Sequence, residues 1–390
     1  MVDTIETATL VAAVDITDIN IISLNKKRDC FQGNSLFFVI TPISLQKFFY
    51  LPMKFLENIS LKPFNTFGIE VSAAYFTKIS SIEELVESID FSIEKKLECL
   101  ILGGGSNVLL TKDYAGLIIK NELAGILLIK EDPSFYYVKA AAGEGWHTFV
   151  MHCIENNYAG VENLSLIPGS VGAAPLQNIG AYGVELKDVF FELEAFNITT
   201  RNIEKFSLSD CDFGYRESVF KRSLKGQYII LNVTFKLNKK HSINTRYGAI
   251  EQELKRMECT NITIKNISQA VINIRTSKLP NPKEIGNAGS FFKNPVIDES
   301  LYQQLIQANP LMPVYPSGNN QYKLAAGWLI EQCGWKGYRK DDAGCHSKQA
   351  LVLVNYGNAK GQEIYDLSTE ILGSVNQKFG VQLEREVNII

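Results

Sequence analysis

The sequence predicts an α+β protein. The helical spacing of Ile82, Leu85 and Ile89 predicts a helix over residues 81–93. The apolar run that follows, at residues 99–102, enters three consecutive glycines and is typical of a strand that ends in a turn. Extended runs and helical patterns continue to alternate along the chain, so we expect strands and helices to share one fold.

The middle of the chain continues this alternation. Residues 136–142 read as a strand that passes through GEGW into a helix over residues 147–157. Nearer the C-terminus, a third helix is expected over residues 323–332, and a buried strand over residues 350–355. The apolar spacing after residue 361 predicts a long amphipathic helix that ends at Gly380.

The last ten residues, 381–390, alternate between apolar and polar side chains and predict a strand. Glu384 and Glu386 fall on the same face of that strand. From the residues alone, a solvated strand edge is the favoured interpretation of this acidic face.

Composition excludes some function classes. The 390 residues are 46% hydrophobic and carry a formal net charge of −3, which supports a substantial core and gives no electrostatic footprint for nucleic acid. Seven cysteines form no CxxC pair, and the four histidines do not cluster. We therefore expect a small-molecule enzyme with reduced thiols and no structural metal.

Two glycine-rich segments are candidates for ligand binding. Residues 103–107 read GGGSN, and residues 167–183 contain four glycines, three alanines and two prolines without a charged side chain. Such segments allow peptide N–H groups to approach a flat or phosphorylated ligand; a tight buried loop is the alternative. A dinucleotide fingerprint would need a third glycine that opens a helix, but Val108 occupies that place.

Six motifs in order give a specific resemblance. They are GGGSN (residues 103–107), GEGW (143–146), IPGSVGAAPLQNIGAYG (167–183), FGYRES (213–218), GNAGSFFKNP (286–295) and KLAAGWLIEQ (323–332). Together they resemble the UDP-N-acetylenolpyruvoylglucosamine reductase (MurB) family, from about Asn65 to Val387. The resemblance implies a vanillyl-alcohol-oxidase type FAD-binding fold in two domains, with a third, C-terminal α+β domain that binds substrate.

The same resemblance implies a chemistry and a domain organisation. NADPH would reduce non-covalently bound FAD, and the flavin would pass hydride to the enolpyruvyl double bond of a UDP-sugar, giving UDP-N-acetylmuramate. The resemblance implies a cytoplasmic enzyme, and we expect a monomer without membrane insertion. The expected segments are an extension over 1–52 that is poorly ordered or not native, FAD-binding parts over 53–123 and 124–279, a substrate-binding domain over 280–380, and a terminal strand over 381–390.

Residues 1–52 match nothing in the family, and Asp3 and Glu6 stand where a signal peptide carries basic residues. We therefore expect Met53 to be the natural start of the protein.

Three residues match the family's catalytic positions. Ser290 matches the proton donor, and Arg216 and Glu386 match the residues that polarise the substrate carboxylate. Without the motifs, Ser290 would be read as a turn residue and Arg216 as a surface residue. Arg385 replaces a proline that the family usually places between its two terminal acids.

Binding residues are expected in two groups. The predicted cofactor contacts all lie in the glycine-rich segments: Gly103, Gly104, Gly105, Ser106, Asn107, Pro168, Gly169, Ser170, Gly172, Ala173, Ile179 and Gly180. The predicted substrate contacts are Tyr182, Tyr247, Lys278, Asn294 and Gln349.

Two alternative functions remain open from the sequence. The first is a related flavin oxidase or dehydrogenase, which would lack the set of Arg216, Ser290 and Glu386. The second is a nucleotide-binding regulator, which would lack the proton donor.

Overall fold

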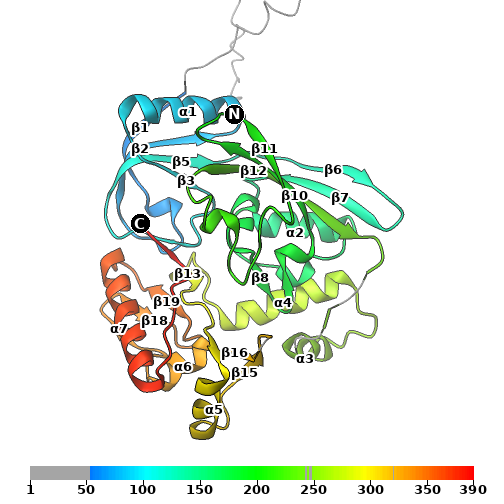
Figure 1. Ribbon diagram of the computed structural model, residues 1–390, viewed down its shortest axis with the longest axis vertical. Helices are drawn as coiled ribbons and strands as arrows, with labels where there is room; N and C mark the ends of the chain where they lie inside the picture. Colours follow the sequence, from blue (N-terminus) through cyan, green and yellow to red (C-terminus); the bar gives the residue numbers. More distant parts are fainter. Residues whose placement is uncertain (1–52, 242–243, 246–247, 319) are drawn as a thin grey trace, which may run out of the picture. The chain divides into compact units, whose positions relative to one another are not determined.

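The computed structural model describes residues 53–241, 244–245, 248–318 and 320–390. The predictions for residues 1–52 and for Tyr247 therefore fall outside the described residues. Figure 1 shows that the described chain builds three successive sheet-and-helix regions.

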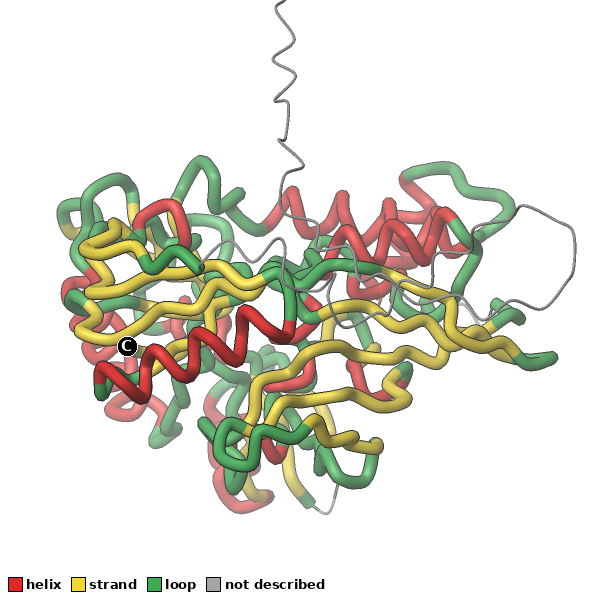
Figure 2. The backbone as a smooth tube through the Cα atoms, turned by 90° about the horizontal axis from the view of Figure 1, so that it is seen from above, coloured by secondary structure: helices red, strands yellow, loops and turns green. Residues whose placement is uncertain are grey.

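The first sheet carries the first glycine loop. Its strand order is β1 (Leu56–Ser60), β2 (Ser72–Ile79), β5 (Tyr114–Asn121) and β3 (Cys99–Leu102), with β1 antiparallel and the other three parallel. The predicted helix is present as α1 (Ile82–Lys95), which begins with a capping box between Ser81 and Glu84. It lies along one face of the sheet, where Leu85 and Ile89 pack against strand residues (Figure 1 and Figure 2).

The second sheet is antiparallel throughout. Its strand order is β11 (Ile203–Ser207), β10 (Phe190–Asn197), β12 (Tyr228–Asn238), β7 (Phe135–Ala141) and β6 (Ile126–Glu131). Helix α2 (Trp146–Glu155) follows β7 through the GEGW motif, as predicted within two residues. Phe149 of this helix packs on Phe235 of β12 with ring centroids 4.4 Å apart, which fixes the helix on the sheet.

The third region is C-terminal. One sheet has the order β13 (Gly286–Ser290), β19 (Val352–Asn355), β18 (Ala343–Cys345) and β17 (Arg339–Lys340), and a smaller one the order β14 (Val296–Asp298), β16 (Gln321–Leu324) and β15 (Val314–Pro316). Its helices are α5 (Glu299–Ala308), α6 (Ala326–Gln332) and α7 (Gly361–Phe379). Two earlier helices, α3 (Gly248–Arg256) and α4 (Ile264–Lys278), pack on each other, and Ile264 of α4 joins the core of the second sheet. As predicted, the long helix stops at Gly380, which is left-handed at φ +65°.

The remaining elements are short. Two-stranded pairs form between β4 (Val108–Leu109) and β20 (Asn388–Ile389) and between β8 (Gly180–Ala181) and β9 (Val184–Glu185). Single 3-10 turns occupy Lys62–Phe64, Glu162–Leu164, Val171–Ala173, Pro175–Gln177, Leu186–Asp188 and Val219–Lys221.

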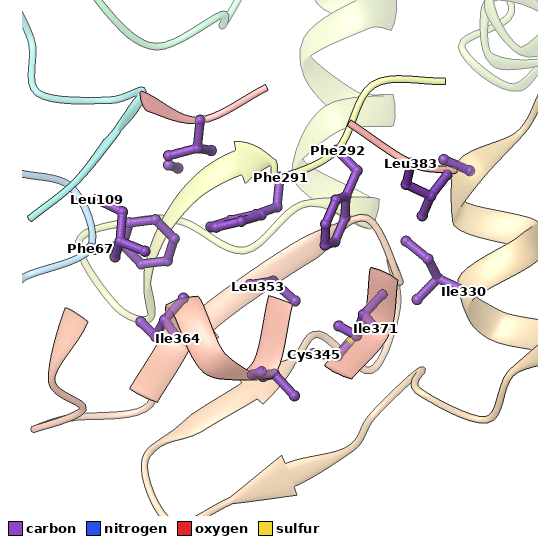
Figure 3. Packing of buried hydrophobic residues seen from close by; sticks show 14 of the residues in the cluster. Phe67, Leu109, Phe291, Phe292, Ile330, Cys345, Leu353, Ile364, Ile371 and Leu383 are labelled. Atoms are coloured by element: carbon purple, nitrogen blue, oxygen red, sulfur yellow. The ribbon is translucent and has the colours of Figure 1, made fainter. Parts of the chain in front are cut away.

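A buried cluster connects the first sheet to the C-terminal region. Phe291 lies on the side of Phe67 and Leu109, and Phe292 lies on the side of Ile330 and Leu383 (Figure 3). Both rings are almost fully buried, at 0% and 1% exposure. The pair anchors the end of β13, the strand that carries Ser290.

Two element predictions need correction. The helix predicted over residues 323–332 begins only at Ala326, because Lys323 and Leu324 belong to β16 and pair with β14 and β15. The strand predicted over residues 381–390 is regular only at Asn388–Ile389. Val381 and Leu383 are buried as the alternation requires, but Ile389 is 37% exposed, since the segment leaves the core to pair with β4.

Candidate active site

The two glycine loops contact each other directly. A Cβ atom on Gly104 would lie 2.9 Å from the Cα of Gly169, and one on Gly103 would lie 2.3 Å from the Oγ of Ser170. Any side chain on Gly104 would therefore force the two backbones apart. The structure adds a reason for these glycines beyond the predicted approach of a ligand, because they also allow the loops to pack against each other.

The first loop presents a run of backbone donors. Among the hydrogen bonds between described residues, none uses the amide N–H groups of Gly104, Gly105, Ser106 or Asn107. Lys120 Nζ donates to the carbonyl oxygen of Gly103 at 2.5 Å. This bond turns the Gly103 carbonyl toward β5 and the N–H of the same peptide unit the opposite way. Successive unpaired N–H groups form an anion-binding cradle, which fits the pyrophosphate of a dinucleotide cofactor.

A cavity of about 670 Å³ lies against both loops. Eleven of the twelve predicted cofactor residues line it, together with Arg216, Ser290 and Glu386. Gly172 is the exception. A Cβ on Gly172 would lie 2.5 Å from the Cβ of Ala142, so this glycine allows the loop to pack on the strand end of β7 and does not face the cavity.

Arg216 lies at the tip of a tight turn. The turn is closed by hydrogen bonds in both directions between the backbones of Gly214 and Glu217. Arg216 has φ +55°, a left-handed conformation that costs an arginine about 1–3 kcal/mol. Its Nη2 donates to the carbonyl oxygen of Gly180 at 2.6 Å, which helps to hold the strained turn.

Arg216 and Glu386 form an ion pair. Arg216 Nε lies 3.1 Å from Glu386 Oε1, and the two side chains are only 20% and 12% exposed. The Nε–H group is not aligned on this oxygen, and among the described residues it has no hydrogen-bond partner. A buried guanidinium with an unused donor is suited to binding a carboxylate of a ligand.

Burial raises the pKa of the Glu386 carboxyl, although the charges of Arg216, Lys221 and Lys293 oppose the increase. Its backbone is fixed on two sides. Glu386 N–H donates to the carbonyl oxygen of Phe291 at 2.8 Å, and Asn107 Nδ2 donates to the carbonyl oxygen of Glu386 at 3.2 Å. The C-terminal segment is thus joined to both β13 and the first glycine loop.

Ser290 is the last residue of β13 and lines the same cavity. Its side chain is solvent-exposed, and no hydrogen bond of its hydroxyl occurs among the described residues. Gly289, left-handed at φ +68°, shapes the end of the strand, and the buried Phe291 and Phe292 hold the following residues. The hydroxyl is therefore free to meet a ligand.

A second cavity, of about 680 Å³, adjoins the first, because Gly180 and Arg216 line both. Four predicted substrate residues line it: Tyr182, Lys278, Asn294 and Gln349. The predicted contact of Tyr247 lies outside the described residues. Asn294 Oδ1 accepts a hydrogen bond from the N–H of Ala326 at 3.0 Å, so its amide is fixed at the start of α6.

The residues that line the second cavity carry an excess of positive charge that the sequence did not reveal. Lys323 and Lys348 line it beside Lys278. Its acidic residues are paired with lysines that do not line it: Glu185 with Lys187 at 2.9 Å, and Glu331 with Lys336 at 2.8 Å. The remaining charge suits a phosphate-bearing ligand.

Arg275 is a site residue that sequence reasoning missed. It lines the first cavity, donates from Nε to the carbonyl oxygen of Leu166 at 3.2 Å, and hydrogen-bonds the side chain of Tyr182. Burial lowers the pKa of its guanidinium. Its position three residues before Lys278, on the same face at the end of α4, was the signal that could have identified it.

Arg385, which stands where a proline was expected, contacts α7. Its Nε donates to Ser368 Oγ at 2.7 Å, its Nη2 donates to Thr369 Oγ1 at 2.6 Å, and its guanidinium lies 4.4 Å from the ring centroid of Tyr365. The arginine thus holds the segment before Glu386 by side-chain contacts in place of a rigid ring.

Comparison with known proteins decides the family. Residues 281–390 match the family described as "UDP-N-acetylenolpyruvoylglucosamine reductase, C-terminal domain", and residues 73–201 match "FAD binding domain". A UDP-N-acetylenolpyruvoylglucosamine reductase of Flavobacterium johnsoniae is 52% identical over 340 residues, which cover 87% of this chain and 100% of the relative. The chain belongs to the UDP-N-acetylenolpyruvoylglucosamine reductase family. The resemblance found in the sequence is therefore confirmed, as is the prediction of an FAD-dependent oxidoreductase.

Other members of the reductase family agree. The reductase of Amoebophilus asiaticus is 52% identical over 334 residues (86% of this chain, 98% of the relative), and that of Pseudomonas savastanoi is 49% identical over 331 residues (85% and 97%). The crystal structure of the Thermus caldophilus reductase has 21% identity and a TM-score of 0.61, covering 86% of this chain and 99% of that chain. That structure supports the predicted fold.

Among the described residues, no helix is long and apolar enough to cross a lipid bilayer. No grouping of His, Cys, Asp and Glu side chains in the same residues could hold a metal ion.

Proposed function

We propose that this protein reduces UDP-N-acetylglucosamine enolpyruvate to UDP-N-acetylmuramate with electrons from NADPH. One observation carries the proposal: Arg216, Ser290 and Glu386 line the same cavity as the two glycine loops. When bound, FAD supplies the redox chemistry, because it accepts hydride from a nicotinamide and passes it to an alkene. The chain itself must bind, orient and protonate the substrate.

The Arg216 and Glu386 pair suits the carboxylate of the enolpyruvyl group. The unused Nε–H of Arg216 can donate to a carboxylate oxygen. The raised pKa of Glu386 makes proton uptake by its carboxyl group easier, and a carboxyl that has taken up a proton can donate a second hydrogen bond as negative charge develops on the substrate carboxylate. Together they would stabilise the enolate-like intermediate that forms when hydride reaches the methylene carbon.

Ser290 would then give a proton to the carbon beside the carboxylate. A serine hydroxyl is a weak acid, so it can act only toward a strongly basic centre at close range. Its exposure to the cavity and the lack of a hydrogen-bond partner among the described residues leave it free for this role.

The second cavity would hold the UDP-sugar. Lys278, Lys323 and Lys348 provide positive charge for the diphosphate, and Tyr182, Asn294 and Gln349 provide aromatic and polar contacts. Tyr247 keeps its predicted role as a substrate contact. Because Arg216 lines both cavities, a ligand in the second cavity can place its reactive end in the first.

Several further expectations belong to the same proposal. FAD would bind non-covalently through the eleven loop residues that line the first cavity, with Arg275 near it. The protein would act as a cytoplasmic monomer. The boundary near residue 123 would separate the two FAD-binding parts from each other, and the boundary near residue 279 would separate them from the substrate-binding domain.

An anaerobic flavin titration tests the proposal. NADPH should bleach the flavin spectrum of the purified protein, and UDP-N-acetylglucosamine enolpyruvate should restore it. In the Ser290→Ala variant, NADPH should still bleach the flavin, but reoxidation of the flavin by the substrate should be about 10²–10⁴ times slower. A flavin that stays reduced would favour a related flavoenzyme with another substrate, and a protein that binds no added FAD would contradict the assignment.

A further inference from the structure

Lys293 is a nearly buried lysine that joins two acidic residues beside the proposed catalytic pair. Its side chain is 8% exposed, and its Nζ lies 2.8 Å from Glu217 Oε1 and 2.6 Å from Glu384 Oε1. Glu217 directly follows Arg216, and Glu384 stands two residues before Glu386. A single ammonium group thus connects the two chain segments that carry Arg216 and Glu386.

We propose that Lys293 is a positioning residue that sets the geometry of Arg216 against Glu386 through its bridge between Glu217 and Glu384. This inference rests on the proposed function, since the pair acts on the substrate carboxylate there. Lys293 lines neither cavity and is not proposed to touch the substrate.

The backbone already fixes one side of the bridge. Lys293 N–H donates to the carbonyl oxygen of Glu384 at 2.9 Å, and Glu386 N–H donates to the carbonyl oxygen of Phe291 at 2.8 Å. Phe292 and Arg385 form an isolated antiparallel bridge between these two bonds. The C-terminal segment would therefore keep its place beside β13 without the lysine side chain.

The other side of the bridge depends on side chains. Glu217 closes the turn that carries Arg216, with its N–H and carbonyl both bonded to Gly214. The remaining ties from this turn to the C-terminal region are also side-chain contacts: Arg216 with Glu386, Tyr215 with Asn294, and Lys323 over the ring of Tyr215 at 4.6 Å. Lys293 is thus the anchor at the base of the turn, and a shift of Glu217 would move the strained Arg216 at its tip.

Electrostatics agree with this role. Burial lowers the pKa of the Lys293 ammonium, but the hydrogen bonds and charges of Glu217 and Glu384 outweigh it and raise that pKa, so the residue stays charged. Lys221 Nζ lies 3.9 Å from the same Glu217 oxygen, which is too far to replace the bond. The charge of Lys293 also lowers the pKa of Glu386, so its removal should raise that pKa further.

The test uses the FAD-loaded enzyme and follows each half of the reaction by stopped flow. Lys293→Met removes the charge and keeps the length of the side chain, and Lys293→Arg can still join two carboxylates. Lys139→Met is the matched control, because Lys139 Nζ also forms a partly buried ion pair, with Glu194 at 2.6 Å in the second sheet. Thermal unfolding and FAD content are measured for all variants.

For Lys293→Met, flavin reduction by NADPH should stay within about twofold of the unaltered enzyme, while reoxidation by UDP-N-acetylglucosamine enolpyruvate should slow about tenfold or more. The pH profile of reoxidation should move to higher pH. Lys293→Arg should retain most of the normal reoxidation rate, and Lys139→Met should change the rate of neither flavin reduction nor flavin reoxidation. Glu217→Gln combined with Lys293→Met should be no slower than the slower single variant.

Two results would overturn the inference: a Lys293→Met enzyme that reoxidises at the normal rate with an unchanged pH profile, or equal losses in both halves that Lys293→Arg does not recover. The second result would indicate a purely structural role. If the unaltered enzyme itself is not reoxidised by the substrate, the proposed function fails instead, and the comparison of variants does not arise.

Discussion

Arg216 Nε lies 3.1 Å from Glu386 Oε1, where the turn that Gly214 and Glu217 close meets the segment that follows α7. The guanidinium and the carboxyl share a largely buried site, yet the Nε–H group keeps an unused donor. An enzyme that stabilises negative charge on a ligand needs such a group, because a fully satisfied pair would have nothing to offer the ligand.

Glu386→Gln should lower activity and change how stability depends on pH. Because a glutamine amide cannot take up or release a proton as charge develops on the substrate carboxylate, we expect reoxidation to slow about 10²–10³-fold. The pKa of Glu386 is raised from its ordinary 4.5, so the folded protein holds this proton at pH values where the unfolded chain has lost it. Ionisation of Glu386 therefore weakens stability as the pH rises through the raised pKa.

The variant should consequently unfold at a higher temperature than the unaltered protein at pH 8, and the difference should shrink as the pH falls toward 4.5. Thermal unfolding across this pH range measures it. A difference that does not vary with pH would show that Glu386 does not titrate abnormally.

Gly104→Ala should weaken FAD retention. The new Cβ would meet the backbone of Gly169 at 2.9 Å, so the loops must separate and the donor cradle must change shape. Gly373→Ala is the matched control: Gly373 lies inside α7, and a Cβ there meets nothing within 4 Å. It should raise the unfolding free energy by about 0.5–1 kcal/mol and leave FAD binding unchanged. Flavin absorbance per protein and chemical denaturation separate the two effects.

Arg385→Ala should destabilise the protein and loosen Glu386. It removes two hydrogen bonds to α7 and the contact with Tyr365, for an expected loss of about 1–2 kcal/mol in the free energy of unfolding. Arg339→Ala is a useful comparison, since Arg339 lies 4.2 Å from the ring centroid of Tyr356 but is 52% exposed. Its cost should stay below about 0.5 kcal/mol. Equal losses for the two variants would argue against a special role for Arg385.

Charge in the second cavity should control substrate affinity. Lys278→Ala should raise the KM for the UDP-sugar about tenfold, with a smaller effect at high salt. Lys336→Ala should also raise that KM, although Lys336 does not line the cavity, because it leaves Glu331 uncompensated there. Steady-state kinetics at two ionic strengths measures both. An unchanged KM for Lys336→Ala would show that Glu331 does not influence the ligand.

The sequence predicted α1, α2, α6 and α7, because apolar spacing is a local signal and Gly380 marks the end of α7, but it did not predict α3, α4 or α5. Residues 323–325 were assigned wrongly because their strand partners lie elsewhere in the chain. The terminal strand was predicted too long for the same reason, because its regular part is set by pairing with β4, which lies far away in the sequence.

Among the site residues, too, those in local motifs could be predicted, and those whose role depends on contacts with distant segments could not. The motifs indicated Arg216, Ser290 and Glu386, and the structure brings all three to one cavity. The bridging role of Lys293 could not be read from its motif, because Glu217 and Glu384 belong to other segments. Lys323 and Lys348 in the second cavity were hidden for the same reason, since a solvated lysine and a cavity lysine look alike in a sequence.

The attachment of the C-terminal segment to the first glycine loop has a consequence for biosynthesis. Asn107 binds Glu386 across 279 positions of sequence, and β20 pairs with β4 over a similar separation. A ribosome delivers the glycine loop early and Glu386 very late, so a chain that is still being translated lacks both the pair with Arg216 and the hydrogen bonds from Asn388 to the carbonyl oxygen of Asn107. Premature termination or trimming just before this segment should therefore remove substrate turnover and weaken the hold of the glycine loop on flavin, so that reductase activity requires complete synthesis of the chain.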